Sequence, residues 1–176
     1  MKHICRLALT LLIITAAVAA ALAGVNALTK KPIADAKEAK IRSAIAQVLE
    51  GDAKPMILTG DTGMVMSAYQ SENGYAVEVA PAGFGGQITM MVGVANDGTI
   101  TGISIVSHSE TAGLGSVAAE DSAKGTAFRE QFTGLTGQLK VDKDGGQIDS
   151  LTGATISSRA ITEGVNAALA FVENLR

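Results

Sequence analysis

The stretch SSRAITEGVNAALAFVENL, residues 157–175, decides the fold because its apolar residues recur at the spacing of one helix face. Ile161, Val165, Leu169 and Val172 follow one another at steps of four, four and three. Side chains at these steps form a single stripe along an α-helix, and such a stripe buries itself against another element. We therefore predict a long C-terminal helix whose apolar face packs on a sheet.

Two upstream segments predict that sheet. MVMSAYQSENGYAVEVA, residues 64–80, has strand-like runs on both sides of Asn73-Gly74, a pair that favours a type I′ hairpin turn. QITMMVGVANDGTITGISIV, residues 87–106, repeats the pattern around Asn96-Asp97-Gly98 and adds β-branched residues after the turn. Two hairpins imply at least four antiparallel strands. The predicted fold class is α+β, an antiparallel sheet packed with helices.

The N-terminal stretch LALTLLIITAAVAAALAGV, residues 7–25, carries no charge. A helix of about 20 apolar residues crosses a hydrocarbon core of about 30 Å. Lys2 and Arg6 precede the stretch and favour an amino end in the cytoplasm. We predict a single-pass helix in the cell (inner) membrane, with the main domain extracytoplasmic. A cleaved signal peptide is the alternative, because Ala21-Leu22-Ala23 fits the small-x-small cleavage pattern.

Four regions are predicted along the chain. They are a short cytoplasmic end (1–6), a transmembrane helix (7–28), a juxtamembrane helix or linker (29–52) and an extracytoplasmic domain (53–176). The juxtamembrane helix is expected to begin after Pro32 and to end at Gly51.

Three further features are predicted in the second half of the chain. Residues 107–122 form a polar, glycine-bearing loop of a size that is usually functional or disordered. Residues 123–135 predict a short helix. Residues 138–150 predict a turn and a strand.

Composition excludes several functions. The single cysteine, Cys5, rules out an internal disulfide and any CxxC motif, and the two histidines, His3 and His108, are far apart in sequence. A net charge of −3 does not favour nucleic acid, and no metal site is expected. If the chain takes part in redox chemistry, its own side chains do not supply the redox centre.

The stretch IDSLTGATISS, residues 148–158, is rich in hydroxyl side chains but has no histidine, cysteine or lysine beside it. Thr155 lies in what is expected to be the first turn of the final helix. Thr155, Ser157 and Ser158 are all candidate cap or first-turn residues, and Gly153 allows a tight entry. A helix N-terminus also holds a phosphate well. Thr155 is therefore either part of a helix cap or a site of modification.

Two segments carry a resemblance to a known family. DSLTGATIS, residues 149–157, resembles the flavinylation motif of FMN-binding domains, in which Asp, two residues, Ser or Thr, Gly, Ala and Thr occur in that order. SHSETAGLG, residues 107–115, resembles a second loop of that family, with Ala112 where proline is usual. With the apolar N-terminus, the pattern is similar to the G-subunit family of Rnf electron transport complexes and to the related C-subunit family of the sodium-pumping quinone reductase. The short chain favours the Rnf family.

The resemblance implies a covalent FMN, esterified to Thr155 by a flavin transferase, and no independent catalytic residues. It implies an electron-relaying subunit of an ion-translocating ferredoxin:NAD oxidoreductase. The expected partners are other Rnf subunits, including integral membrane and iron–sulfur subunits, and membrane lipid. The cofactor-binding residues it implies are, in the motif, Asp149, Thr152, Gly153, Ala154 and Thr155, and, in the loop, Glu110, Thr111, Gly113, Leu114 and Gly115.

Two alternatives stay open from the sequence. The nearer one keeps the flavin and changes the assembly, to a quinone reductase or another exported FMN carrier. The farther one is a non-redox surface module in which the threonine only caps a helix.

Overall fold

The computed structural model describes residues 2–58 and 62–176 of the chain. Met1, where the predicted cytoplasmic end begins, and positions 59–61 of the predicted extracytoplasmic domain lie outside the described residues. The chain separates into two compact units, residues 1–40 and residues 41–176. The first unit is helical and the second contains an antiparallel sheet with helices, so the predicted α+β fold with a preceding apolar helix is confirmed.

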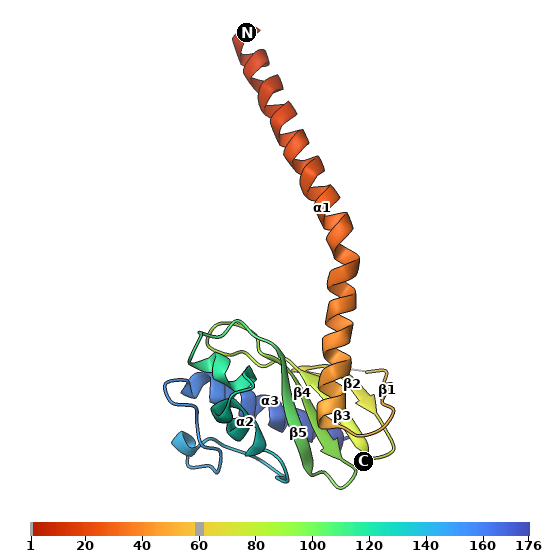
Figure 1. Cartoon of the computed structure of the whole chain (residues 1–176), viewed down its shortest axis with the longest axis vertical. Helices are drawn as coiled ribbons and strands as arrows, with labels where there is room; N and C mark the ends of the chain where they lie inside the picture. The colour runs from red at the N-terminus through yellow and green to blue at the C-terminus, as the bar shows by residue number, and fades with distance from the viewer. Residues whose placement is uncertain (1, 59–61) are drawn as a thin grey trace. The chain divides into compact units, whose positions relative to one another are not determined.

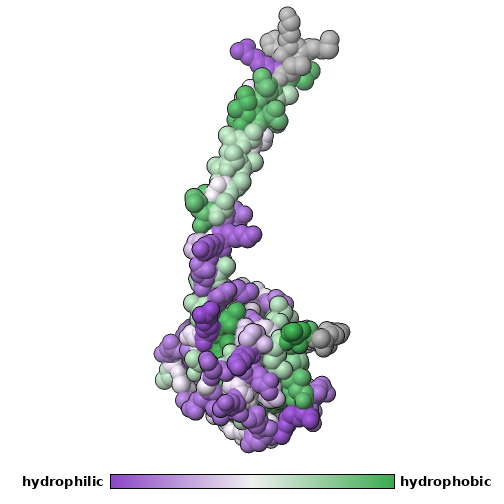
Figure 2. Space-filling model, turned by 90° about the vertical axis from the view of Figure 1, so that its right-hand side faces the viewer, coloured by the Kyte–Doolittle hydropathy of each residue, from purple (hydrophilic) through white to green (hydrophobic). Residues whose placement is uncertain are grey.

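Helix α1 (Lys2–Val48) contains the apolar N-terminal stretch. The side chains from Leu7 to Val25 are all exposed, and within the described residues α1 is the helix that is long and apolar enough to cross a membrane. Figure 2 shows the apolar side chains along this part of α1 and the polar side chains that follow on the same helix. Apolar surface of this extent is stable where lipid, rather than water, surrounds it.

The helix boundary predicted at Pro32 is wrong, because α1 continues through Pro32 and ends at Val48. A proline inside a helix removes one backbone hydrogen bond and usually marks an end or a kink. The residues on both sides of Pro32 are mainly alanine, lysine and leucine, which are good helix formers and favour a continuous helix. The domain boundaries at residues 28 and 52 stay predictions.

Five antiparallel strands form one sheet in the order β1-β2-β3-β4-β5 (Figure 1). Each strand pairs with the strand that follows it in sequence, so both predicted hairpins are confirmed. The strands are β1 (Lys54–Pro55), β2 (Val65–Gln70), β3 (Gly74–Val79), β4 (Thr89–Ala95) and β5 (Ile100–Ser107).

Both faces of the central strands are covered. Successive residues of a strand point to opposite faces. Val77 and Val92 therefore join a core shared with α2 (Ala123–Glu130) and α3 (Thr155–Glu173), while Ala76 and Met91 pack against the last turns of α1. Because both faces are buried, β4 is apolar at consecutive positions rather than alternating with polar residues.

The apolar stripe predicted for the C-terminal helix is confirmed in α3. Ile161, Val165 and Val172 are fully buried, and Leu169 is half-buried against the same core. The stripe contacts strands β2, β3 and β4. This packing fixes the axis of α3, and with it the position of the helix N-terminus.

The first hairpin turn differs from its prediction. A type I′ turn needs a positive φ at both central residues, and no non-glycine residue in ranges 2–58 and 62–176 has one. The backbone N–H of Ser71 donates to the carbonyl of Gly74 over 2.9 Å, so Glu72 and Asn73 form the loop. Gly74 instead begins β3, where a side chain would overlap the backbone of Val94.

The remaining expectations are met in part. The second hairpin turns at Asn96-Asp97-Gly98 as predicted, with Gly98 at a φ of +90°, and the short helix is present as α2. The strand predicted within residues 138–150 is wrong. That segment forms the short 3-10 helix η2 (Asp142–Asp144) and one parallel bridge between Val141 and Ile148. The polar loop at 107–122 contains a second 3-10 helix, η1 (Gly115–Ala119).

Substitutions at Gly93 and at its cross-strand partner Gly102 can test the packing of the last turn of α1 on the sheet. A Cβ on Gly93 would overlap the Val48 carbonyl oxygen, which accepts a hydrogen bond from Thr101 Oγ1. We expect Gly93→Ala to lower the free energy of unfolding by about 1–3 kcal/mol, measured by denaturant titration. On Gly102 the added Cβ would lie 3.9 Å from the Val48 side chain, an ordinary contact. Gly102→Ala should change stability by less than about 0.5 kcal/mol, and equal effects would contradict this packing.

Candidate functional site

The segment before α3 turns sharply into the helix. The backbone N–H of Ala154 donates to the carbonyl of Leu151 over 2.9 Å, and Gly153 has a φ of +77°. A glycine with positive φ at the third position is what a type II turn requires. The helix begins at Thr155 with Ala154 as its N-cap, and no side chain makes the cap hydrogen bond. Thr155 is therefore a first-turn residue and does not serve as the cap.

The hydroxyl groups at the start of α3 have different partners. Ser157 Oγ donates to Glu110 Oε2. Ser158 Oγ donates to the carbonyl of Ala154 and accepts from the N–H of Leu151, both over 3.0 Å. Within the described residues no hydrogen bond is found for the Thr155 hydroxyl, which is half-exposed. Thr155 is the hydroxyl that remains available to a ligand.

Glu110 joins three segments of the chain. Its Oε1 accepts from the backbone N–H of Gly85 over 2.8 Å, and its Oε2 accepts from Ser157 on α3. A Cβ on Gly115 would overlap both Glu110 Oε2 and Ser157 Oγ, so only glycine leaves room for this contact. The carboxylate thus holds the loop after β5 against the loop after β3 and the first turn of α3.

These segments enclose a pocket of about 330 Å³ beside Thr155. Three of its lining side chains are apolar and exposed: Phe84 (68%), Leu114 (42%) and Ile156 (51%). Exposed apolar side chains that converge on one hollow are typical of a ligand site. Phe84 was not predicted as a site residue from the sequence. The feature that could have indicated it is an aromatic residue between glycines in AGFGGQ, residues 82–87.

The structure brings together most of the predicted cofactor-binding residues. Those that line the pocket are Glu110, Thr111, Leu114, Gly115, Gly153, Ala154 and Thr155. The other three, Gly113, Asp149 and Thr152, are exposed and do not line it. Gly113 has a φ of +74° in the turn closed by the N–H of Leu114 and the carbonyl of Thr111.

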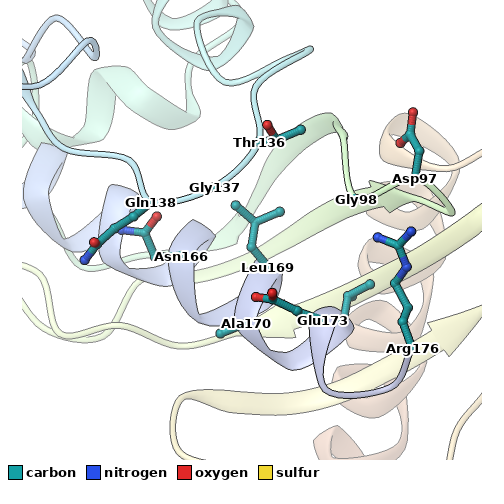
Figure 3. Close-up of a pocket in the computed structure, with 11 residues that line it drawn as sticks. Asp97, Gly98, Thr136, Gly137, Gln138, Asn166, Leu169, Ala170, Glu173 and Arg176 are labelled. Carbon is teal, nitrogen blue, oxygen red and sulfur yellow. The ribbon is translucent and has the colours of Figure 1, made fainter.

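A second hollow, of about 480 Å³, lies at the other end of α3 (Figure 3). Its lining includes Asp97 from the second hairpin turn, together with Glu173 and Arg176 near the chain's end. The backbone N–H of Thr99 is the main cause that holds the pKa of Asp97 below its usual value. None of the predicted cofactor-binding residues lines this hollow, so the pocket beside Thr155 is the candidate site.

Asp142 supports the segment that leads to Thr155. Its Oδ1 accepts from both the hydroxyl and the backbone N–H of Ser150. These bonds, the Ser150 hydroxyl first, lower the pKa of Asp142 from 3.8 to about 2. Hydrogen bonds to a carboxylate favour its charged form.

The lowered pKa of Asp142 predicts a pH dependence of stability. Because the folded-state pKa lies below the unfolded value, the charged carboxylate stabilises the fold above about pH 4, and this contribution is lost as the pH falls through about 2. We expect the difference in free energy of unfolding between the native sequence and Asp142→Asn to shrink between pH 4 and pH 2, measured by denaturant unfolding. A difference that stays constant over this range would contradict the assignment.

Comparisons with known proteins agree with the geometry. The family model of the FMN-binding domain matches residues 83–170, and that of the RnfG N-terminal region matches residues 1–48. The G subunit of the proton-translocating ferredoxin:NAD(+) oxidoreductase complex of Clostridium ljungdahlii is 34% identical over 140 residues, which cover 78% of this chain and 75% of that one.

Two further relatives have the same kind of name. The G subunit of the ion-translocating oxidoreductase complex of Methanosarcina acetivorans is 30% identical over 97% of this chain and 95% of its own. The G subunit of the Na(+)-translocating ferredoxin:NAD(+) oxidoreductase complex of Acetobacterium woodii is 36% identical over 58% of this chain and half of its own. The chain therefore belongs to the FMN-binding domain family and, within it, to the G subunits of ion-translocating oxidoreductase complexes.

Proposed function

We propose that this chain is a membrane-anchored electron-transfer subunit that carries FMN covalently on Thr155. The observation that carries the proposal is the free hydroxyl of Thr155, which lines an apolar pocket at the N-terminus of α3. FMN, when bound, supplies reversible electron transfer, which no side chain of this sequence supplies.

The start of α3 fits the phosphate end of FMN. The first backbone N–H groups of a helix have no partner within the helix, and the helix dipole is positive there. Thr155, Ile156 and Ser157 supply such groups beside the Thr155 hydroxyl. A phosphate esterified to Thr155 would lie within reach of these donors, which favours the negative charge.

The pocket walls fit the ring system. Leu114 and Phe84 offer exposed apolar surface that a flat aromatic ring would cover, and Gly115 and Gly153 keep the backbone close to the cavity. A Cβ on Gly153 would lie 3.1 Å from the Leu114 side chain, so a larger residue there would crowd this wall. Glu110 would act chiefly by holding the loops together, because both its oxygens already accept hydrogen bonds from the protein.

Modification of Thr155 requires an external enzyme. An aliphatic hydroxyl is a weak nucleophile and needs a base, and the carboxylate in this pocket, Glu110, accepts from Ser157 and Gly85 instead. A flavin transferase would supply the missing base. The exposed residues Asp149 and Thr152 belong to the motif and would be read by that enzyme rather than by the flavin.

The relatives support the proposed assembly. Their names place them in ion-translocating oxidoreductase complexes, two of them specified as ferredoxin:NAD(+) oxidoreductases. This chain would relay electrons between other Rnf subunits, including integral membrane and iron–sulfur subunits. The apolar part of α1 would anchor it, with the amino end in the cytoplasm and the FMN-binding domain on the other side.

Loss of the Thr155 hydroxyl should abolish covalent FMN. We expect the chain, coexpressed with a flavin transferase, to gain the mass of FMN minus water and to stay fluorescent in a denaturing gel. Thr155→Ala should show neither signal. Thr133→Ala removes another exposed threonine hydroxyl outside the pocket and should be modified normally. An unmodified native chain, or a modified Thr155→Ala chain, would refute the proposal.

The orientation of the anchor can be tested with cysteine labelling. Cys5 is the single cysteine of the sequence and lies on the predicted cytoplasmic side. We expect a membrane-impermeant maleimide to label Cys5 only after spheroplasts are permeabilised. Thr133→Cys in a Cys5→Ser background should be labelled on intact spheroplasts. A mature chain that lacks Cys5 would show instead that the N-terminal stretch is a cleaved signal peptide.

A further inference from the structure

Three consecutive backbone N–H groups before α3 are each held by a side chain from another part of the fold. The N–H of Asp149 donates to Gln131 Oε1 over 2.7 Å. The N–H of Ser150 donates to Asp142 Oδ1 over 3.1 Å. The N–H of Leu151 donates to Ser158 Oγ over 3.0 Å. We call residues 149–155 the acceptor segment, because they end at Thr155, the residue proposed to accept FMN.

The Gln131 side chain makes two hydrogen bonds to the backbone of Asp149, one to its N–H and one to its carbonyl. Besides accepting from the Asp149 N–H, its amide Nε2 donates to the Asp149 carbonyl over 3.3 Å. Gln131 is the C-cap residue of α2, and the next residue, Phe132, is fully buried against Phe128. The glutamine is therefore anchored by core packing while its amide reaches the surface.

Asp142 is anchored just as firmly. Its own N–H donates to the carbonyl of Ile148 over 2.7 Å, and Ile148 returns a bond to the carbonyl of Lys140 over 3.1 Å. Val141 and Ile148 are both buried in the main core. The carboxylate then holds Ser150 by its hydroxyl and its backbone.

The Asp149 and Thr152 side chains are left exposed by this arrangement. A loop whose backbone donors were satisfied by water alone would sample many conformations, and a partner enzyme would have to order it on binding. Side-chain bonds from Gln131, Asp142 and Ser158 remove that freedom in advance. The backbone conformation of the acceptor segment is therefore set before any partner arrives.

We propose that Gln131, Asp142 and Ser158 are positioning residues that hold the acceptor segment in the conformation a flavin transferase recognises. This inference rests on the proposed flavin attachment to Thr155 and adds the residues that govern its rate. None of the three touches the pocket beside Thr155, so their effect is on the modification reaction rather than on the flavin.

The reaction is a phosphoryl-group transfer without any change of oxidation state. The donor class is a flavin dinucleotide, in which FMN is joined to a nucleoside monophosphate by a pyrophosphate bond. A bond forms between Thr155 Oγ1 and the flavin-side phosphorus, and the pyrophosphate P–O bond breaks. The nucleoside monophosphate leaves, and the threonine proton passes to the transferase base and then to solvent.

The test measures the initial rate of flavin attachment to the purified full chain in detergent, with the transferase and the flavin dinucleotide. We expect Gln131→Ala and Asp142→Ala each to lower this rate about five-fold, and the double variant to lower it about twenty-fold, because ordering of the segment then falls on the transferase. Ser158 is fully buried, so it is left unchanged.

Matched controls lie beside each substituted residue. Glu130→Ala alters the exposed neighbour of Gln131, and Asp144→Ala removes a carboxylate of η2 that bonds Arg159 instead of the acceptor segment. Both should keep the rate within about two-fold, since the exposed ion pair that Asp144 makes with Arg159 contributes little and, within the described residues, Glu130 makes no hydrogen bond with the acceptor segment. Asp142→Asn keeps an oxygen that can accept from the Ser150 N–H, and it should restore at least half of the normal rate.

Amide hydrogen exchange of the unmodified chain gives an independent readout. The N–H groups of residues 149–151 should exchange faster in the alanine variants, while those of the central strands should not change. Alanine variants that are modified at the normal rate, or show unchanged exchange, would overturn the proposal. If the double variant unfolds, Asp142→Ala and its rescue by Asp142→Asn decide the question. A native chain that accepts no flavin at all would instead refute the proposed function.

Discussion

The packing of the α3 stripe on the sheet is the constraint on which the site depends. Ile161, Val165 and Val172 are fully buried there, so α3 cannot slide or rotate without exposing them to water. Its N-terminus is thereby fixed beside the loops that follow β3 and β5. Glu110 then joins both loops to the first turn of α3. The pocket beside Thr155 therefore depends on the core that positions α3 and on the Glu110 carboxylate that holds the loops against it.

Local patterns predicted most of the elements, and each error has a physical cause. The period of α3 and the glycine of the second turn depend on neighbouring residues, and both were predicted correctly. Pro32 suggested a boundary, but good helix formers surround it and α1 continues. Residues 138–150 were predicted to contain a strand, and they include the apolar residues Val141 and Ile148. They are apolar because they enter the core, and they pair only with each other by a single bridge.

The site was predictable only where a motif marked it. Thr155 and the loop from Glu110 to Gly115 were found through resemblance, and most of them line one pocket. Phe84, Gln131 and Asp142 were missed because their roles depend on contacts between distant positions. Gln131 meets Asp149 across 18 residues, and Glu110 meets Ser157 across 47. Neither pairing leaves a periodic signal, so a single sequence cannot reveal it.

The hydroxyl groups at the start of α3 differ in their hydrogen bonds within the fold. Ser157 and Ser158 are buried, and their hydroxyl groups make hydrogen bonds to Glu110, Ala154 and Leu151. If Thr155 were needed for the fold, it would be bonded in the same way, but among the described residues it has no such partner. A free hydroxyl without a base is stable in water and reacts only when another enzyme supplies that base. Under the proposed function, the fold holds Thr155 accessible for modification, and the partner enzyme determines when that reaction takes place.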